Sequence, residues 1–218
     1  MMKKCIILAN GLSPCKNTVK YFHNKGYKTL LCADGGANSA KTLDIIPQYI
    51  IGDLDSIKPN VYEYYRGKCE IIKINRQNDT DVEKCLRFVI KKKYNEVVLL
   101  GATGDRLDHS ICNLGIILKY FRNIKILVIH KKSLLSAYTG NIYLNTIPNE
   151  IISLYGFDAK THIKSSGLKY PLKNIALPFG QKESTSNIAL NNTVQLQIKG
   201  GIIFVIRDFG LLKKHDLF

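Results

Sequence analysis

Two aspartates separated by one residue, Asp53 and Asp55, have types and spacing that suit metal chemistry. In an extended segment, side chains at positions i and i+2 point to the same side. Neighbouring carboxylates repel each other unless a cation or hydrogen-bond donors neutralise them, and Mg²⁺ prefers oxygen ligands of this kind. The pair therefore predicts a magnesium site, with a solvated acidic turn as the alternative interpretation.

Two further motifs combine small and acidic residues. In Asp34-Gly35-Gly36, the glycines allow backbone to approach a ligand closely, and the helix start that follows offers N–H groups to phosphate. Asn78-Asp79-Thr80-Asp81 opens a helical pattern in which Asp79 or Thr80 can serve as the N-cap and the helix dipole favours Asp81. Which of Asp79 and Asp81 contacts a metal is left open by the sequence.

A fourth motif runs from Gly101 to His109 and includes Asp105. The planar guanidinium of Arg106 suits a phosphate group, and Asp108 can cap the next helix while facing a metal or nucleotide. His109 is either a ligand contact or a locally packed side chain. The sequence GxxxxGK[ST] does not occur, which disfavours a P-loop enzyme.

Buried strands and amphipathic helices must position these motifs. Residues 80–92 have one apolar face and a Thr80–Glu83 capping-box pattern, and in residues 108–120 the positions Ile111, Leu114 and Leu118 recur at helical spacing. Short apolar runs typical of parallel strands occupy residues 5–9, 29–33, 49–51, 70–74, 97–100 and 124–129. This alternation predicts a doubly wound, mostly parallel α/β domain, in which ligands bind at the carboxyl ends of the strands.

The later part of the chain shows strand patterns and turns without a convincing amphipathic helix. Residues 193–198 alternate, and Gly200-Gly201 followed by residues 202–206 predicts a hairpin. Turns are also predicted at 178–180 and at Asn191-Asn192. We therefore expect an α/β domain over residues 1–136 and an all-β, sandwich-like domain over residues 137–218.

Composition narrows the class of protein. The formal net charge of +15 is compatible with a nucleic-acid-binding protein, but the lysines are scattered, and the same charge would attract a polyanionic small substrate. No apolar run approaches the ~20 residues of a membrane span, so we expect a cytoplasmic protein with neither a membrane nor a nucleic-acid partner. The cysteines lack zinc-site spacing and are expected to be free thiols: Cys5, Cys15, Cys32, Cys69, Cys85 and Cys112.

Taken in order, the four motifs resemble the thiamine pyrophosphokinase family, whose catalytic domain carries ADGGAN, GDxDS, an acidic xTD cluster opening a helix, and GxRxDH. Residues 166–172 are similar to the GLKW segment of the family, and residues 184–187 to its STSN segment. The resemblance spans nearly the whole chain. It implies Mg²⁺- and ATP-dependent pyrophosphoryl transfer to thiamine, giving thiamine diphosphate and AMP.

The resemblance also implies residue roles. The metal would be bound by Asp53, Asp55 and Asp81, and these three would share the catalytic role with Arg106 and Asp108. ATP would be surrounded by Asp34, Gly35, Gly36, Arg106, Asp108 and His109. Thiamine would contact Asp81, Gly167, Leu168, Tyr170, Ser184, Ser186 and Asn187. The family is dimeric, which implies a homodimer whose thiamine sites combine the α/β domain of one chain with the β domain of the other.

Three positions depart from the family pattern. Asn78 stands where many relatives have an acid, Asp105 stands where Gly is frequent and receives no role, and Tyr170 stands where Trp is frequent. Tyrosine can still stack on a heteroaromatic ring with less area, or serve as an ordinary core or interface aromatic. Two other functions remain as alternatives at this stage: another Mg²⁺-dependent phosphoryl or nucleotidyl transferase, and a basic nucleic-acid-binding protein.

Overall fold

The computed structural model describes residues 2–76, 78–104 and 106–217. It forms two compact units, Met1–Lys131 and Lys132–Phe218. The boundary predicted between residues 136 and 137 falls within β7 (Ser133–Asn145), whose first residues pair with the end of β12 (Thr193–Asp208). None of the described helices has the length and apolar character needed to cross a membrane.

The first unit contains a parallel sheet in the order β6-β5-β1-β2-β3-β4. Its strands are β1 (Lys4–Leu8), β2 (Thr29–Ala33), β3 (Tyr49–Gly52), β4 (Glu70–Lys73), β5 (Glu96–Leu100) and β6 (Lys125–His130). Its helices are α1 (Lys16–Asn24), α2 (Gly36–Thr42), α3 (Pro59–Tyr65), α4 (Asp81–Lys91) and α5 (Leu107–Tyr120). The predicted parallel α/β architecture and all six predicted strands are confirmed.

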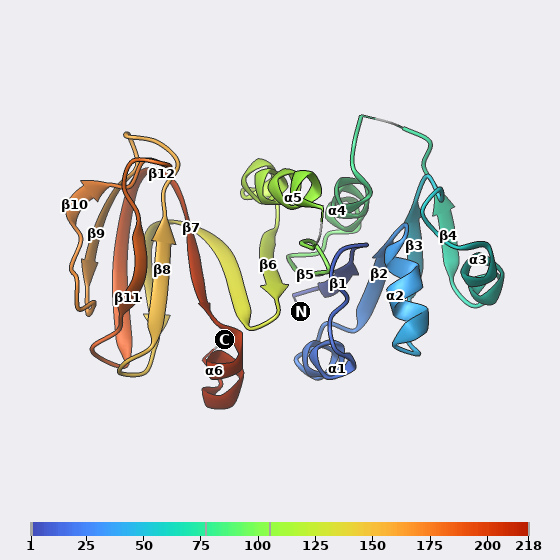
Figure 1. The fold of residues 1–218 in the computed structure, drawn as a ribbon, viewed down its shortest axis with the longest axis horizontal. Helices are drawn as coiled ribbons and strands as arrows, with labels where there is room; N and C mark the ends of the chain where they lie inside the picture. The colour runs from blue at the N-terminus through green and yellow to red at the C-terminus, as the bar shows by residue number, and fades with distance from the viewer. Residues whose placement is uncertain (1, 77, 105, 218) are drawn as a thin grey trace. The chain divides into compact units, whose positions relative to one another are not determined.

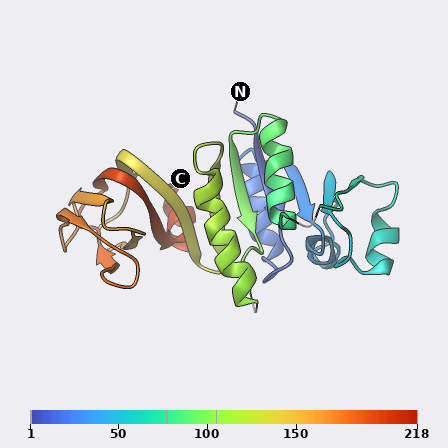
Figure 2. The same cartoon turned by 90° about the horizontal axis from the view of Figure 1, so that it is seen from above.

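The strand order reverses between β1 and β5, because the chain builds outward from β1 to β4 and then returns to β5 on the other side of β1. Right-handed crossovers in opposite directions place their helices on opposite faces of a sheet. Figures 1 and 2 show this arrangement, with α4 and α5 on one face and α1 and α2 on the other. The carboxyl ends of β1 and β5 therefore border a crevice of the kind that binds ligands in open α/β sheets.

The predicted cap of α4 is confirmed in part. The Thr80 hydroxyl oxygen accepts a hydrogen bond from the Glu83 backbone N–H at 3.3 Å. The Glu83 carboxylate does not return to the Thr80 backbone as a capping box requires. It instead accepts hydrogen bonds from Lys119 Nζ at 2.5 Å and from the Tyr120 hydroxyl at 2.6 Å, and so ties α4 to α5.

The predicted apolar face of α5 is wrong. The helix buries Asn113, Ile116 and Ile117, whereas Ile111 is 62% exposed. Because apolar residues occur around most of this helix, their spacing alone does not identify the side that packs on the sheet. The predicted Asp108 cap is also wrong: the N-cap position belongs to Arg106, and Asp108 lies in the first turn.

The second unit is built mainly from antiparallel strands. They are β7, β8 (Ile151–Tyr155), β9 (His162–Ser166), β10 (Lys173–Ala176), β11 (Ser184–Ile188) and β12, and a short helix α6 (Phe209–His215) follows. The first half of β12 pairs with β9 and its second half with β8, while β7 pairs along both halves. A cluster of buried aliphatic side chains fills the interior, so the predicted sandwich-like β domain is confirmed, with α6 as an unpredicted addition.

The predicted hairpin at Gly200-Gly201 is wrong, because β12 continues through these residues as one strand. Its pairing with β7 shifts register between Ile198 and Ile203, which marks an irregularity within the ladder. Gly200 has φ +87°, and a Cβ at Gly201 would lie 2.0 Å from Thr161 Oγ1. The two glycines thus permit an irregular segment in a long strand, while the predicted turn at Pro178 is confirmed by the hydrogen bond from Gln181 N to Pro178 O.

Candidate active site

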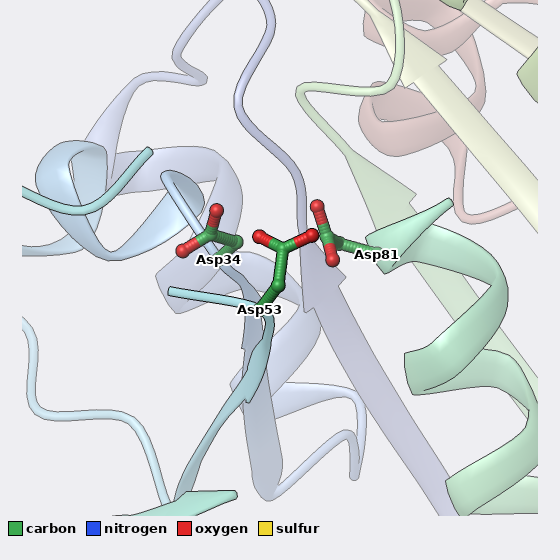
Figure 3. Close-up of side chains that lie close together, drawn as sticks. All are labelled: Asp34, Asp53 and Asp81. Atoms are coloured by element: carbon green, nitrogen blue, oxygen red, sulfur yellow. The ribbon is translucent and has the colours of Figure 1, made fainter. Parts of the chain in front are cut away.

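Three carboxylates converge at the carboxyl edge of the parallel sheet (Figure 3). Asp34 follows β2, Asp53 follows β3, and Asp81 begins α4; one oxygen from each lies within 4.8 Å of the other two. We call these residues the carboxylate cluster. A Cβ at Gly52 would lie 2.6 Å from Asp34 Cβ and 3.1 Å from Asp81 Oδ1, so the absence of a side chain at Gly52 permits this convergence.

Asp34 is the buried member of the carboxylate cluster, with 1% of its surface exposed. Its Oδ2 accepts a hydrogen bond from Ser56 N at 2.9 Å, and its Oδ1 is buried with no hydrogen-bond partner among the described residues. Burial raises the pKa of Asp34 to about 6, and the charges of Asp81 and Asp55 act in the same direction, against the Ser56 N–H. An ionised Asp34 therefore lacks compensation that a bound cation would supply.

The donor set fits a hard divalent cation. All three members of the carboxylate cluster offer oxygen atoms, which Mg²⁺ prefers, and a buried oxygen without a partner is a position where a cation would relieve an unfavourable charge. Carboxylates at this edge of the sheet also lie where substrate phosphates could complete the coordination of the ion.

Asp55 lies beside the carboxylate cluster rather than within it. Leu54 has φ +70°, so the chain turns between Asp53 and Asp55, and the same-side relation expected for an extended segment does not apply. The Asp55 backbone N–H points to Asp53 Oδ1 at 3.4 Å, and its carboxylate accepts a hydrogen bond from the Ser56 hydroxyl at 2.9 Å. The structure thus groups Asp34, not Asp55, with the other two carboxylates.

The two acids at the start of α4 have different surroundings. The Asp79 carboxylate pairs with Arg76 and lies 3.4 Å from Arg87 Nε. Asp81 instead faces Asp53 and Asp34. Asp79 is therefore neutralised by arginines, and Asp81 is the acid of this motif that lies with Asp34 and Asp53.

Lys84 is a member of the site that the sequence interpretation missed. Its Nζ lies 2.9 Å from Asp81 Oδ1 and 3.4 Å from Asp53 Oδ2, and its side chain is 1% exposed. Burial opposes the charged form, but the contacts with Asp81 and Asp53 outweigh burial and raise the pKa of Lys84. The only signal in the sequence was its spacing of three residues from Asp81, which places both side chains on one face of a helix.

A pocket of about 340 Å³ adjoins the carboxylate cluster at the crevice between β1 and β5. The loops after these strands hold each other in place: Gly11 N donates to Gly101 O at 2.7 Å, and Leu12 N donates to Thr103 O at 2.8 Å. Asn113 of α5 adds a buried hydrogen bond from its side-chain amide to Ala102 O at 2.6 Å. The pocket wall thus consists of backbone segments that are joined by hydrogen bonds.

The predicted nucleotide residues are distributed unevenly around this pocket. Of these residues, Gly35, Arg106 and His109 line it, whereas Gly36 is buried at the start of α2; Asp81, predicted as a metal and thiamine residue, also lines it. Polar residues that the sequence interpretation did not assign also line it: Asn10, Ser56, Thr103 and Ser110. For Asn10, the available signal was a polar residue and a glycine directly after a buried strand.

Arg106 and Asp108 form a two-point ion pair at the mouth of the pocket. Arg106 Nε and an η nitrogen lie 3.2 and 2.5 Å from the two Asp108 carboxylate oxygens. This contact holds the pKa of Asp108 below its ordinary value. Both side chains are exposed, and His109 Nε2 lies 4.0 Å from Asp108, so the three predicted residues are grouped together. Asp105 lies outside the described residues.

In the second unit, two segments far apart in the sequence are joined around a smaller hollow. The buried side chain of Asn187 accepts a hydrogen bond from Tyr170 N at 3.1 Å and donates to Tyr170 O at 2.7 Å and Ser184 Oγ at 3.1 Å. Tyr170, Ser184 and Asn187 line a pocket of about 240 Å³, and Tyr170 is 59% exposed. The Tyr170 side chain is therefore accessible for contact, and the hydrogen bonds of Asn187 join the segment that contains Tyr170 to β11.

The remaining predicted thiamine residues lie near this hollow but have different surroundings. Leu168 is buried in the aliphatic core of the second unit. Gly167 has φ +83°, and its backbone carbonyl accepts a hydrogen bond from Leu190 N. Ser186 has φ +55°, and its N–H donates to Ser153 Oγ at 3.0 Å. These three residues shape the two segments that carry the pocket.

Comparison with known proteins gives matches over both units. A family model described as "Thiamin pyrophosphokinase, catalytic domain" matches residues 21–128, and one described as "Thiamin pyrophosphokinase, vitamin B1 binding domain" matches residues 141–203. Thiamine pyrophosphokinase 3 of Oryza sativa is 31% identical, covering 77% of this chain and 73% of that protein. Thiamin pyrophosphokinase 1 of Caenorhabditis elegans is 26% identical, covering 97% and 92%.

Solved structures give the same result for the fold. The crystal structure of yeast thiamin pyrophosphokinase matches with a TM-score of 0.84 and 21% identity, covering 98% of this chain and 89% of that one. The crystal structure of thiamine pyrophosphokinase from Bacillus subtilis matches with a TM-score of 0.79 and 24% identity, covering 94% and 99%. The fold is therefore shared with these proteins over nearly the whole chain.

Proposed function

We propose, for a chain that belongs to the thiamine pyrophosphokinase family, that it transfers a pyrophosphoryl group from ATP to the hydroxyl of thiamine and yields thiamine diphosphate and AMP. The two family models match this chain in order and together span most of its length. The observation that carries the proposal is the carboxylate cluster beside a pocket at the carboxyl ends of the strands. Phosphate transfer needs such a combination of cation ligands and backbone donors.

The carboxylate cluster is proposed as the Mg²⁺ site, with Asp34, Asp53 and Asp81 as ligands and Asp55 as a neighbouring oxygen donor. When bound, Mg²⁺ would neutralise negative charge on the phosphate oxygens. Asp34 supplies the buried oxygen without a partner, and the Ser56 N–H holds the other oxygen of Asp34 in place. The metal predicted from the sequence is thus retained, with Asp34 added to its proposed ligands.

The reaction requires the thiamine oxygen to form a bond to the β-phosphorus of ATP while the bond from that phosphorus to the AMP oxygen breaks. Arg106 would exchange its exposed contact with Asp108 for a phosphate oxygen, because its guanidinium offers paired N–H donors. Asp81 would orient the thiamine hydroxyl and accept its proton as the bond to phosphorus forms, and the hydrogen bond from Lys84 Nζ holds the Asp81 carboxylate in position. Transfer of this kind depends mainly on positioning and charge neutralisation.

Thiamine is proposed to contact the second unit at the hollow lined by Tyr170, Ser184 and Asn187. The exposed Tyr170 ring would stack on a heteroaromatic ring of thiamine. We further propose a homodimer in which the second unit of one chain and the first unit of its partner share each thiamine site. A cytoplasmic location is proposed because all six cysteines are free thiols.

The metal assignment is tested by Asp53→Asn, which removes one ligand charge with little change in volume. Losing charge stabilisation at a transferring phosphoryl group should lower turnover at least ~100-fold, as removal of an oxyanion-stabilising donor does. Calorimetric titration of the metal-free protein with Mg²⁺ should show weakened binding as well. Near-normal turnover and Mg²⁺ binding in the variant would refute the assignment, and Asp44→Asn, at an exposed acid outside the carboxylate cluster, serves as the control.

A further inference from the structure

Lys84 of α4 is unusual for a lysine because its side chain is buried. Lys91, on the same helix, is exposed, whereas Lys84 is buried beneath the carboxylate cluster. Removing an ammonium group from water is unfavourable unless partners replace its hydration. Lys84 has such partners in Asp81 and Asp53, so its burial depends on the same carboxylates that are proposed to bind the metal.

The position of Lys84 shows what its charge does. Its Nζ contacts Oδ1 of Asp81 and Oδ2 of Asp53, so one ammonium joins the end of β3 to the first turn of α4. Asp34 has no contact with Lys84 among those the structure gives, and its Oδ1 has no partner in the described part of the chain. The ammonium group of Lys84 thus neutralises part of the negative charge of Asp53 and Asp81. Asp34 is left for another cation to neutralise.

We propose that Lys84 is a positioning residue that holds Asp53 and Asp81 together before Mg²⁺ binds. This proposal rests on the metal site of the proposed function. Without the lysine, three carboxylates would approach one another with only backbone and hydroxyl donors nearby, and their mutual repulsion would push β3 and α4 apart. With the lysine, the ligand oxygens are arranged in advance, which lowers the cost of ordering them when the ion arrives.

The test compares Lys84→Met with Lys91→Met, each measured by thermal unfolding in EDTA and in saturating Mg²⁺. Methionine keeps most of the aliphatic length of lysine and removes its charge. In EDTA, Lys84→Met should lower the Tm by at least about 5 °C, because it leaves paired acids without their buried partner, and Lys91→Met should change it little. Mg²⁺ should raise the Tm of Lys84→Met by less than that of the unaltered protein, because the variant must order its ligand oxygens when the ion binds and therefore binds it more weakly.

A double-mutant cycle with Asp81→Asn separates a positioning role from simple packing. If Lys84 acts through the carboxylates, Lys84→Met should lower the Tm less than half as much in the Asp81→Asn background, because one repelling charge is already absent. Should Lys84→Met alone fail to fold, folding of the double variant would support the proposal and its failure would contradict it. The positioning role would be overturned if Lys84→Met lowered the Tm equally in the unaltered and Asp81→Asn backgrounds. It would also be overturned if Lys84→Met lowered the Tm equally in EDTA and in Mg²⁺.

The outcomes also distinguish this proposal from the proposed function. If the unaltered protein forms thiamine diphosphate but Lys84→Met and Lys91→Met have the same Tm in EDTA and in Mg²⁺, the positioning role of Lys84 is refuted. The proposed function is then unaffected. If Mg²⁺ does not stabilise the unaltered protein, the metal assignment fails. The cycle in EDTA still decides whether Lys84 positions Asp81 in that case, since it needs no metal.

Discussion

Replacing Asp34 with asparagine changes the charge of the carboxylate cluster while preserving its shape. Asp34 has φ +41°, a left-handed backbone conformation that asparagine also adopts more readily than most residues. The amide oxygen of asparagine can accept the hydrogen bond from Ser56 N, and its NH₂ group can donate toward the neighbouring carboxylates. The substitution therefore removes one buried negative charge and retains the local hydrogen bond.

The magnitude follows from the pKa of Asp34. The difference between its ordinary pKa of 3.8 and its folded value of about 6 corresponds to about 3 kcal/mol, at 1.36 kcal/mol per pKa unit. Because the folded pKa is the higher one, the folded protein binds the proton more tightly than the unfolded chain. Metal-free protein should therefore lose stability as pH rises from about 4 to about 6 and stay level above that range.

The assay is chemical unfolding of metal-free Asp34→Asn and unaltered protein in EDTA between pH 4 and 8. At pH 7.5 the variant should be more stable by up to about 3 kcal/mol, and its stability should not show the fall between pH 4 and 6. Asp44→Asn is the matched control, because Asp44 also has a positive φ, +54°, but its side chain is 87% exposed.

The same substitution should remove function while it adds stability. Asp34→Asn should lower thiamine diphosphate formation at least ~100-fold, because a proposed metal ligand has lost its charge. A metal-free variant that is less stable than the unaltered protein at pH 7.5 would refute the electrostatic account of Asp34. A more stable variant with full activity would refute its role as a ligand.

Three further predictions concern the acids of α4, the thiamine pocket and the assembly. Asp81→Asn should lower turnover far more than Asp79→Asn in steady-state assays, because Asp79 pairs with two arginines; equal losses would contradict this distinction. Tyr170→Ala should raise the KM for thiamine with little change in the KM for ATP, and the reverse pattern would argue against a stacking role. Mixing inactive Asp53→Asn chains with inactive Tyr170→Ala/Ser184→Ala chains should restore part of the activity if sites are shared; confirmed subunit exchange without recovery would rule the shared site out.

Most strands of the first unit were predictable because they are buried on both faces and read as continuous apolar runs, whereas the edge strand β4 is only partly buried. The face of α5 was not predictable from spacing, since packing on the sheet selected Ile116 and Ile117 from a helix with apolar residues on several sides. Gly200-Gly201 has the composition of a hairpin turn. However, β12 pairs with β7 on both sides of the two glycines, so the strand continues through them. The local sequence does not indicate this pairing, because the partner strand is distant along the chain.

The candidate site shows the same division between local and long-range information. Asp53 and Asp81 were predictable because acids at strand ends and helix starts meet at one edge of a parallel sheet. Asp34 was expected to lie near ATP, but its place beside these two acids depends on the neighbouring positions of β2 and β3 and on the missing side chain of Gly52. Lys84 resembles a surface lysine in sequence, and only the packing of α4 shows that it is buried.

The central claim is tested most directly by incubating the purified protein with ATP, Mg²⁺ and thiamine and measuring every product by chromatography. The account predicts thiamine diphosphate and AMP in equal amounts, and no thiamine diphosphate when EDTA replaces Mg²⁺. Formation of ADP in place of AMP, or the absence of thiamine diphosphate from a folded and Mg²⁺-saturated protein, would contradict it.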